Sequence, residues 1–335
     1  MSGSGTARTV RRAGLGVLGL GLGAAAAAAA VTFGGRHLRR GADPDRVEDL
    51  QMPADLRVHR VPSHDGGHLH VVERGEGTPV LCAHGVMLSS RTWVRQLRDL
   101  PAAGFRVVAF DHRGHGDSVP GAEGHDVRAL ARDIRSVIEH LDLGAVVLVG
   151  HSMGGMAALS FVLDHAPVAA TRLGALVLCS TTSRAPFGAD PRLRLLLGRV
   201  SRHSPDAASL LGAADLGHLV TRVGFGRGAD PAAVELTRRM IVACSRDTRL
   251  GATRALFDFD VTDRLAEIRH PTWVLAGTAD LLTPPREARR LARGIGGAHL
   301  RLVPGGGHML MLEAPEVLAG VLREAARPAD GAAVA

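Results

Sequence analysis

Hydrophobic and polar residues follow two alternating patterns along the chain from about residue 56 onward. Residues 56–61 and 68–73 alternate apolar and polar positions, and the turn sequence Asp65-Gly66-Gly67 lies between them. Successive side chains of a strand point to opposite faces and glycine permits a tight turn, so this pattern predicts a β-hairpin. Short apolar runs predict six more strands, over residues 79–83, 106–110, 145–149, 173–179, 272–276 and 299–303.

Amphipathic segments lie between these strands. Within residues 126–141, apolar side chains recur every three or four positions, at Val127, Leu130, Ile134 and Ile138, which is typical of a buried helix face. The same kind of pattern predicts helices over residues 90–100, 153–165, 286–295 and 314–326. Strands that alternate with helices predict an α/β fold, in which a mainly parallel sheet is covered on both faces.

Residues 183–262 interrupt this series. They have a helical pattern broken by glycines, and they contain no convincing strand. Because the alternation of strands and helices resumes after them, we expect residues 183–262 to form a helical cap, or lid, over one end of the sheet. Residues 56–182 and 263–327 are then expected to form the α/β core.

An uncharged segment precedes the core. Residues 13–33 are rich in Gly and Ala, and three arginines lie on each side of them. In a helix with a rise of about 1.5 Å per residue, these 21 residues can cross a bilayer core of about 30 Å. We therefore expect residues 1–33 to form a hydrophobic membrane anchor. The alternative is an export signal of the Sec or twin-arginine type, because Arg11-Arg12 precedes a weakly apolar stretch with small residues. Residues 34–55 predict a linker.

Composition and charge limit the function classes. The formal charge is +7, but the arginines are scattered, Tyr is absent and aromatic residues make up only 3% of the chain. Because aromatic side chains that could stack on bases are few and the basic residues do not form a run, we expect no nucleic-acid partner. The three cysteines, Cys82, Cys179 and Cys244, lack the spacing of metal ligands, and we expect no metal.

A serine lies where a strand is expected to turn into a helix. Gly150-His151-Ser152-Met153-Gly154 fits the G-x-S-x-G pattern between the strand over 145–149 and the helix over 153–165. A serine on this sharp turn has its hydroxyl raised above the sheet edge, and the glycines leave room for a strained backbone. A serine at a helix start often serves only as a cap, but this placement favours Ser152 as a nucleophile.

A serine nucleophile needs a base, and the base needs an orienting carboxylate. Asp280 and His308 each follow a late predicted strand, and three glycines directly precede His308. The carboxyl ends of strands are where open α/β sheets build their sites. We therefore predict a catalytic triad of Ser152, His308 and Asp280. Asp260 and Asp263 are rival acids, but they precede a strand instead of following one.

Hydrolysis at a carbonyl also needs hydrogen-bond donors for the developing oxyanion. The backbone N–H of Met153, the residue after the nucleophile, is one expected donor. The second is expected from the loop after His84-Gly85, and we assign it to the backbone N–H of Val86.

Together, five motifs in this order resemble the α/β-hydrolase superfamily over about residues 56–326. They are His84-Gly85, residues 111–118, the elbow at 150–154, residues 277–280 with Thr283-Pro284, and Gly307-His308. Within the superfamily the chain is most similar to capped lipases and esterases of the monoacylglycerol-lipase type. The resemblance implies an eight-stranded, mainly parallel sheet with helices on both faces, a helical cap after strand 6, an acyl-serine intermediate and no cofactor. Residues 111–118 would form a structural loop beside the site.

The resulting hypothesis is a serine carboxylic-ester hydrolase that acts on a lipid-like or small acyl ester. Thioesterases, acyltransferases, cofactor-free perhydrolases and carbon–carbon bond hydrolases share the same elbow and remain alternatives. A serine at the elbow argues against haloalkane dehalogenases and epoxide hydrolases, which have an aspartate there. A non-enzymatic binding module is the weakest hypothesis, because no triad member is missing.

Apolar cap residues are candidates for lining an acyl pocket. They are Leu193, Leu195, Leu196, Leu197, Leu210, Leu211, Leu219 and Val220. Packing of the cap against the core explains their apolar character equally well. Apart from a small acyl ester as substrate and membrane association through residues 13–33, the sequence indicates no partner, and it leaves the oligomeric state open.

Overall fold

The computed structural model describes residues 50–185 and 214–327. Residues 1–33 of the predicted anchor or signal, most of the predicted linker at 34–55, and residues 186–213 of the predicted cap lie outside the described residues. At the end of the predicted linker, Leu50 is buried and Met52 packs against the same hydrophobic cluster of the core.

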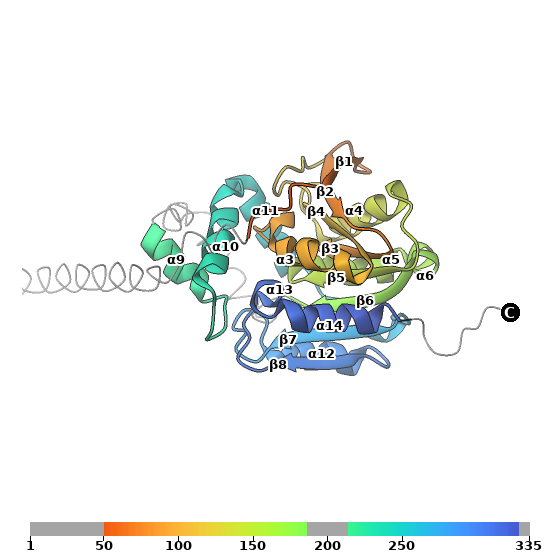
Figure 1. Cartoon of the computed structure of the whole chain (residues 1–335). Coiled ribbons are helices and arrows are strands. Elements are labelled where there is room, and N and C mark those ends of the chain that lie inside the picture. Colours follow the sequence, from red (N-terminus) through yellow and green to blue (C-terminus); the bar gives the residue numbers. More distant parts are fainter. Residues whose placement is uncertain (1–49, 186–213, 328–335) are drawn as a thin grey trace, which may run out of the picture.

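Eight strands form one sheet in the order β1-β2-β4-β3-β5-β6-β7-β8 (Figure 1). They are β1 (Arg57–Pro62), β2 (His68–Arg74), β3 (Thr78–Ala83), β4 (Phe105–Phe110), β5 (Val146–His151), β6 (Leu173–Cys179), β7 (Thr272–Gly277) and β8 (His299–Val303). Strand β2 pairs antiparallel with β1 and β4, and the pairs from β4 to β8 are parallel. The predicted eight-stranded, mainly parallel sheet is therefore confirmed.

Helices cover both faces of the sheet (Figure 1). Those that pack on one face are α4 (Val127–His140), α5 (Met153–Asp164), α6 (Ala166–Arg172) and α12 (Pro285–Gly294). Those on the other face are α3 (Val94–Asp99), α13 (Leu310–Glu313) and α14 (Pro315–Ala325). Along β5, Val146 and Leu148 join the first hydrophobic cluster, whereas Val147 and Val149 join the second. A strand with apolar residues on both faces is what a sheet between two helix layers requires.

Between β6 and β7 the described chain is helical, as the predicted cap after strand 6 requires. The cap helices are α9 (Ala214–Arg222), α10 (Pro231–Ala243) and α11 (Arg246–Phe257), and Figure 1 shows them together at one side of the core. Asp230 and Ser245 accept backbone N–H groups at the starts of α10 and α11, which stabilises both helix ends. Three short 3₁₀ helices, η1 (Ser90–Trp93), η2 (Pro101–Ala103) and η3 (Thr262–Glu267), complete the described elements.

In the described part of the chain, no single helix combines the length and the apolar character that a bilayer span needs. Helices α5 and α6 meet that test only as a pair, and they are bent by 102° relative to each other.

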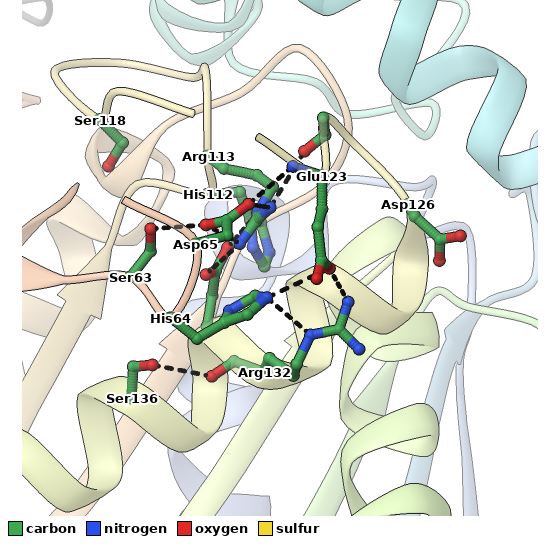
Figure 2. Close-up of polar contacts among 12 residues, drawn as sticks. Ser63, His64, Asp65, His112, Arg113, Ser118, Glu123, Asp126, Arg132 and Ser136 are labelled. Atoms are coloured by element: carbon green, nitrogen blue, oxygen red, sulfur yellow. Dashed lines mark hydrogen bonds and ion pairs between the residues drawn. The ribbon is translucent and has the colours of Figure 1, made fainter. Parts of the chain in front are cut away.

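A buried ion-pair network holds the loop that follows β4 (Figure 2). The Arg113 side chain is fully buried and donates two hydrogen bonds of 2.7 Å to Asp133 of α4. It also donates one of 2.9 Å to Asp65, in the turn of the β1–β2 hairpin. Because an unpaired charge is costly inside a protein, the three residues fix this loop against both the sheet and α4. The loop leads from the carboxyl end of β4, and its His112 N–H donates to Nε2 of His84, the residue that follows β3, at 2.9 Å.

Candidate active site

Ser152 lies at the turn between β5 and α5, with backbone angles φ 52° and ψ −116°. A positive φ is strained for a residue with a side chain, and such strain is concentrated at functional sites. A Cβ atom on Gly150 would lie 2.5 Å from the Gly154 carbonyl oxygen, and one on Gly154 would lie 2.2 Å from the Ala83 carbonyl oxygen. The close approach of β5, α5 and β3 therefore explains why glycine occupies both positions of the motif.

Asp280 and His308 are in direct contact, although they follow different strands. Nδ1 of His308 lies 2.9 Å from Oδ2 of Asp280, and both side chains are buried. The other carboxylate oxygen, Oδ1, accepts the backbone N–H groups of Leu282 at 2.8 Å and Thr283 at 2.9 Å. The Thr283 hydroxyl donates to Oδ2 at 2.7 Å. The carboxylate is thus held in one orientation, facing the imidazole.

The same contacts set the charge of Asp280. Burial alone would raise its pKa, because it disfavours the ionised carboxylate. The His308 ring and the Thr283 N–H and hydroxyl groups outweigh burial and hold the Asp280 pKa below its ordinary value. An ionised carboxylate at Nδ1 favours the tautomer with its proton on Nδ1, so Nε2 of His308 is left as the basic nitrogen.

His308 packs against the residue that precedes Ser152. The ring centroids of His151 and His308 are 4.7 Å apart, and Nε2 of His151 lies 3.0 Å from the His308 carbonyl oxygen. Among the described residues no hydrogen bond joins the Ser152 hydroxyl to the His308 ring. Such contacts are commonly long without substrate and tighten when it binds. The structure thus brings Asp280 and His308 together and places them next to the Ser152 turn.

The two backbone groups predicted to bind an oxyanion flank Ser152. Met153 begins α5, where N–H groups lack partners within the helix, and Val86 follows Gly85. A Cβ atom on Gly85 would lie only 3.2 Å from Cβ of Ser152, so the Val86 loop lies directly against the serine. Within the described ranges, neither N–H donates to a protein acceptor. Both groups are therefore available to a substrate oxygen.

The two rival acids lie elsewhere. Asp260 and Asp263 are exposed near the start of η3. Asp260 accepts the backbone N–H of Thr262 at 2.9 Å, and neither acid contacts His308 in the described part of the chain. Asp280 was chosen over these two acids in the sequence because it follows a strand end. Of the three acids, it is the one that contacts the imidazole of His308.

A model of the alpha/beta hydrolase family matches residues 80–321 of the chain. The chain belongs to this family. The protein is thus a hydrolase, in agreement with the sequence prediction, and its fold is the one that the family resemblance implies.

Several known proteins are similar to this hydrolase over most of its length. A non-heme haloperoxidase from Rhodococcus erythropolis is 32% identical over 276 residues, which cover 78% of this chain and 97% of that protein. The solved esterase from Exiguobacterium antarcticum has a TM-score of 0.72 and 25% identity, and the match covers 81% of this chain and 99% of the esterase. A thermophilic esterase from Thermogutta terrifontis has a TM-score of 0.68 and 28% identity, over 80% of this chain and 97% of the esterase.

Further residues of this site had no role predicted from the sequence. Thr181 donates from its hydroxyl to the Ser152 carbonyl oxygen at 2.6 Å, and thereby supports the strained turn. Thr283 belongs to one of the sequence motifs, but the sequence predicts no role for it. In the structure its N–H and hydroxyl groups donate to the Asp280 carboxylate and hold it in place. His151 was only a variable position of the elbow motif. Thr181 is a polar residue two positions after β6, and Thr283 lies in the loop that follows β7, so a search for polar side chains beyond strand ends could have found both.

Three more buried histidines of this hydrolase, His84, His112 and His115, lie close together, and His84 is two residues before Val86. The His84 ring centroid is 4.6 Å from that of His112 and 5.3 Å from that of His115. Burial lowers the pKa of His84 to about 4 and that of His115 to about 3, and the nearby His84 ring adds to the effect on His115. Burial, with the neighbouring rings, also holds the His112 pKa well below its ordinary value. All three rings are therefore neutral at pH 7.

Two groups of side chains in the described ranges bring metal-type ligand atoms within 4.8 Å of one another. They are His64, Asp65 and Glu123, and His70, Asp111 and Asp117. Asp65 and Glu123 already pair with Arg113 and Arg132 (Figure 2). The Asp111 oxygens accept the backbone N–H groups of Ser90 at 2.6 Å and Asp117 at 3.0 Å. Neither group includes a residue of the predicted triad, so we assign neither a role in the reaction.

The cap residues predicted to line an acyl pocket are only partly within the described chain. Leu193, Leu195, Leu196, Leu197, Leu210 and Leu211 lie outside the described residues. In α9, Leu219 is partly buried, whereas Val220 is 49% exposed. A cavity of about 890 Å³ lies between α10 and the edge formed by β1 and β2, and Met52, Val58, Leu88 and Met240 are among its lining residues. No residue of the predicted triad is among the described residues that line this cavity.

Proposed function

We propose that this hydrolase is a serine esterase that cleaves small acyl esters through Ser152, His308 and Asp280. The observation that carries the proposal is the buried contact of 2.9 Å between His308 and Asp280, beside a serine held at φ 52°. Solved esterases with 25% and 28% identity over about four fifths of the chain add support. A carboxylate that orients a histidine next to a strained serine is the arrangement that acyl transfer uses.

In the proposed reaction, the Ser152 hydroxyl attacks the ester carbonyl while Nε2 of His308 takes its proton. The N–H groups of Val86 and Met153 stabilise the negative oxygen of the tetrahedral intermediate. His308 then gives the proton to the leaving alcohol, and an acyl-serine remains. Water, activated by His308, attacks this acyl group, and the acid product leaves with regeneration of Ser152. Asp280 stays ionised throughout and stabilises the imidazolium that forms twice in the cycle.

Small esters are favoured over lipids as the substrate class. The similar solved structures from Exiguobacterium antarcticum and Thermogutta terrifontis are esterases, and neither they nor the similar haloperoxidase are named as lipases. The lipid part of the sequence hypothesis therefore has no support from these relatives. We accordingly propose short acyl chains as the preferred substrates.

A perhydrolase is the second candidate, because a non-heme haloperoxidase is 32% identical over 97% of its own length. In that reaction hydrogen peroxide replaces water and attacks the acyl-serine. The products are a peracid and regenerated Ser152. The same triad serves both reactions, and only the second nucleophile differs.

A series of p-nitrophenyl esters from acetate to palmitate tests the proposal. We expect turnover to be greatest for acetate or butyrate. When hydrogen peroxide is added, a peracid should form only if the enzyme is also a perhydrolase. A maximum at palmitate would contradict the small-ester proposal. Absence of turnover on all esters, in a protein whose Ser152 still reacts with a fluorophosphonate, would reject the esterase and favour other acyl chemistry.

We also propose that residues 1–33 attach the enzyme to a membrane, with a cleaved export signal as the alternative. The uncharged stretch at 13–33 with arginines on both sides supports this. Membrane fractionation of the full chain and the N-terminal sequence of the mature protein distinguish the two. A full-length protein in the soluble fraction would contradict both.

A further inference from the structure

Glu313, the last residue of α13, accepts three backbone hydrogen bonds. Its Oε2 atom accepts the N–H groups of Gly226 at 2.6 Å and Gly307 at 3.0 Å. Its Oε1 atom accepts the N–H of Met309 at 2.9 Å. Gly307 and Met309 are the two neighbours of His308 in the chain, so this carboxylate holds the backbone on both sides of the candidate base.

The third donor, Gly226, belongs to the cap, between α9 and α10. Two further hydrogen bonds join the same segments: the His308 N–H donates to the Gly224 carbonyl at 2.8 Å, and the Arg227 N–H donates to the Gly305 carbonyl at 3.3 Å. A Cβ atom on Gly307 would lie 2.2 Å from the Gly226 nitrogen. Residues 224–227 of the cap and the loop at 305–309 therefore lie in direct backbone contact, with the Glu313 carboxylate between them.

We propose that Glu313 is a positioning residue for His308 and that it fastens cap residues 224–227 to the loop of the catalytic histidine. The inference rests on the proposed role of His308 as the base. Asp280 orients the imidazole ring through Nδ1, whereas Glu313 fixes the backbone from which that ring extends. Hydrogen bonds to an ionised acceptor are stronger than those between neutral groups, so one carboxylate can hold three loop amides in place.

Replacement of Glu313 by glutamine or alanine tests this role in the full-length protein. Glutamine keeps one acceptor oxygen and turns an NH₂ group toward amides that need an acceptor, and alanine removes both oxygens. We expect the kcat per active site on p-nitrophenyl butyrate to fall at least tenfold in Glu313→Gln and further in Glu313→Ala. The change in KM should be smaller than the change in kcat, because the binding groups around Ser152 remain.

The active sites are counted by titration with a fluorophosphonate, and Glu316→Gln is the matched control. Glu316 is exposed, lies three residues away at the start of α14, and should behave like the unchanged protein. A purely structural role of Glu313 would reduce the number of sites that titrate and leave the kcat of each site unchanged. That result would overturn the inference.

Amide hydrogen exchange in the unchanged protein tests the contacts without any variant. The N–H groups of Gly226, Gly307 and Met309 should exchange slowly although they lie outside helices and strands, since each donates to Glu313. Rapid exchange at all three would overturn the inference even if no Glu313 variant folds. If Ser152→Ala keeps the full rate of hydrolysis, the proposed function itself fails. If Ser152→Ala is inactive but Glu313→Gln has the kcat of the unchanged protein, only the role of Glu313 is rejected.

Discussion

At the scale of single residues, Asp280 is held by a turn of its own sequence. Its carboxylate accepts the N–H groups of Leu282 and Thr283 and the Thr283 hydroxyl, all within three residues. An aspartate that binds backbone groups two and three residues ahead is a recurrent turn motif. The acid is therefore oriented locally, before the distant His308 contributes its contact.

Replacement of Thr283 by valine keeps the shape of the side chain but removes its hydroxyl. Oδ2 of Asp280 then loses one of its donors, and the carboxylate can rotate away from the imidazole. We expect kcat on p-nitrophenyl butyrate to fall about tenfold, which corresponds to about 1.4 kcal/mol of transition-state stabilisation. A kcat equal to that of the unchanged protein would show that the two backbone N–H groups suffice.

The sequence predicted the positions of Ser152, Asp280 and His308 because each follows a strand end, and the structure brings Asp280 and His308 into contact. Their catalytic roles stay predictions. Glu313 could not be predicted in this way. Its cap partner Gly226 is 87 residues earlier in the chain, and no local pattern links a glutamate to backbone groups so far away.

At the scale of elements, the turn from β5 to α5 depends on contacts with β3. A side chain at residue 154 would meet the Ala83 carbonyl at 2.2 Å and the His84 carbonyl at 2.7 Å. Ala83 is the last residue of β3 and pairs with β4 and β5, so its carbonyl cannot move without loss of strand pairing. Glycine at this position is therefore required by packing as well as by the shape of the turn.

Gly154→Ala should accordingly destabilise the protein, by about 1–3 kcal/mol as for other overpacked sites. Gly144→Ala is the matched control, because a Cβ atom there would have nothing within 4 Å. Chemical denaturation of both variants measures the effect. Equal stability of the two variants would contradict the packing argument.

The predicted strands agree with the observed ones to within two residues at each end, because buried strands are short apolar runs bounded by polar or glycine residues. Two helices were not predicted. Helix α13 has only four residues, too few to show a helical period. Helix α6 has 7 residues and lies beyond residue 165, where the predicted helix ends, and about two turns are too few to show a helical period.

At the scale of the whole molecule, buried neutral histidines link folding to pH. In the unfolded chain a histidine has a pKa of about 6.5, whereas burial lowers the pKa of His84 to about 4 and of His115 to about 3 in the folded protein. Below pH 6.5 the unfolded state binds more protons than the folded one. The contribution of these two buried histidines to the free energy of unfolding is therefore fully present above about pH 6.5. It decreases as the pH falls toward 4.

Each of these two histidines should cost about 2 kcal/mol of folding free energy at pH 5 relative to pH 7. In His115→Asn the difference in unfolding free energy between pH 7 and pH 5 should shrink by about that amount, because one of the buried rings is gone. Urea denaturation at both pH values measures this. An unchanged difference would show that His115 does not bind the extra proton on unfolding.

The overall architecture was predictable because the alternation of strands and helices fixes the fold class, and the interruption at 183–262 marks the cap. The contacts between cap and core could not be predicted, because they join residues that are far apart in the chain. Residues 224–227 and the loop at 305–309 are such a case. The predicted anchor at 1–33 and cap residues 186–213 lie outside the described chain, and those predictions remain as they were.

The most direct test of the proposed function compares the hydrolysis of p-nitrophenyl butyrate by the unchanged protein and by Ser152→Ala. The unchanged protein should turn the ester over, and the variant should lose at least a thousandfold in kcat while it unfolds at nearly the same temperature, because the hydroxyl forms the acyl intermediate. Substantial turnover by the folded variant would contradict Ser152 as the nucleophile, and with it the proposed mechanism.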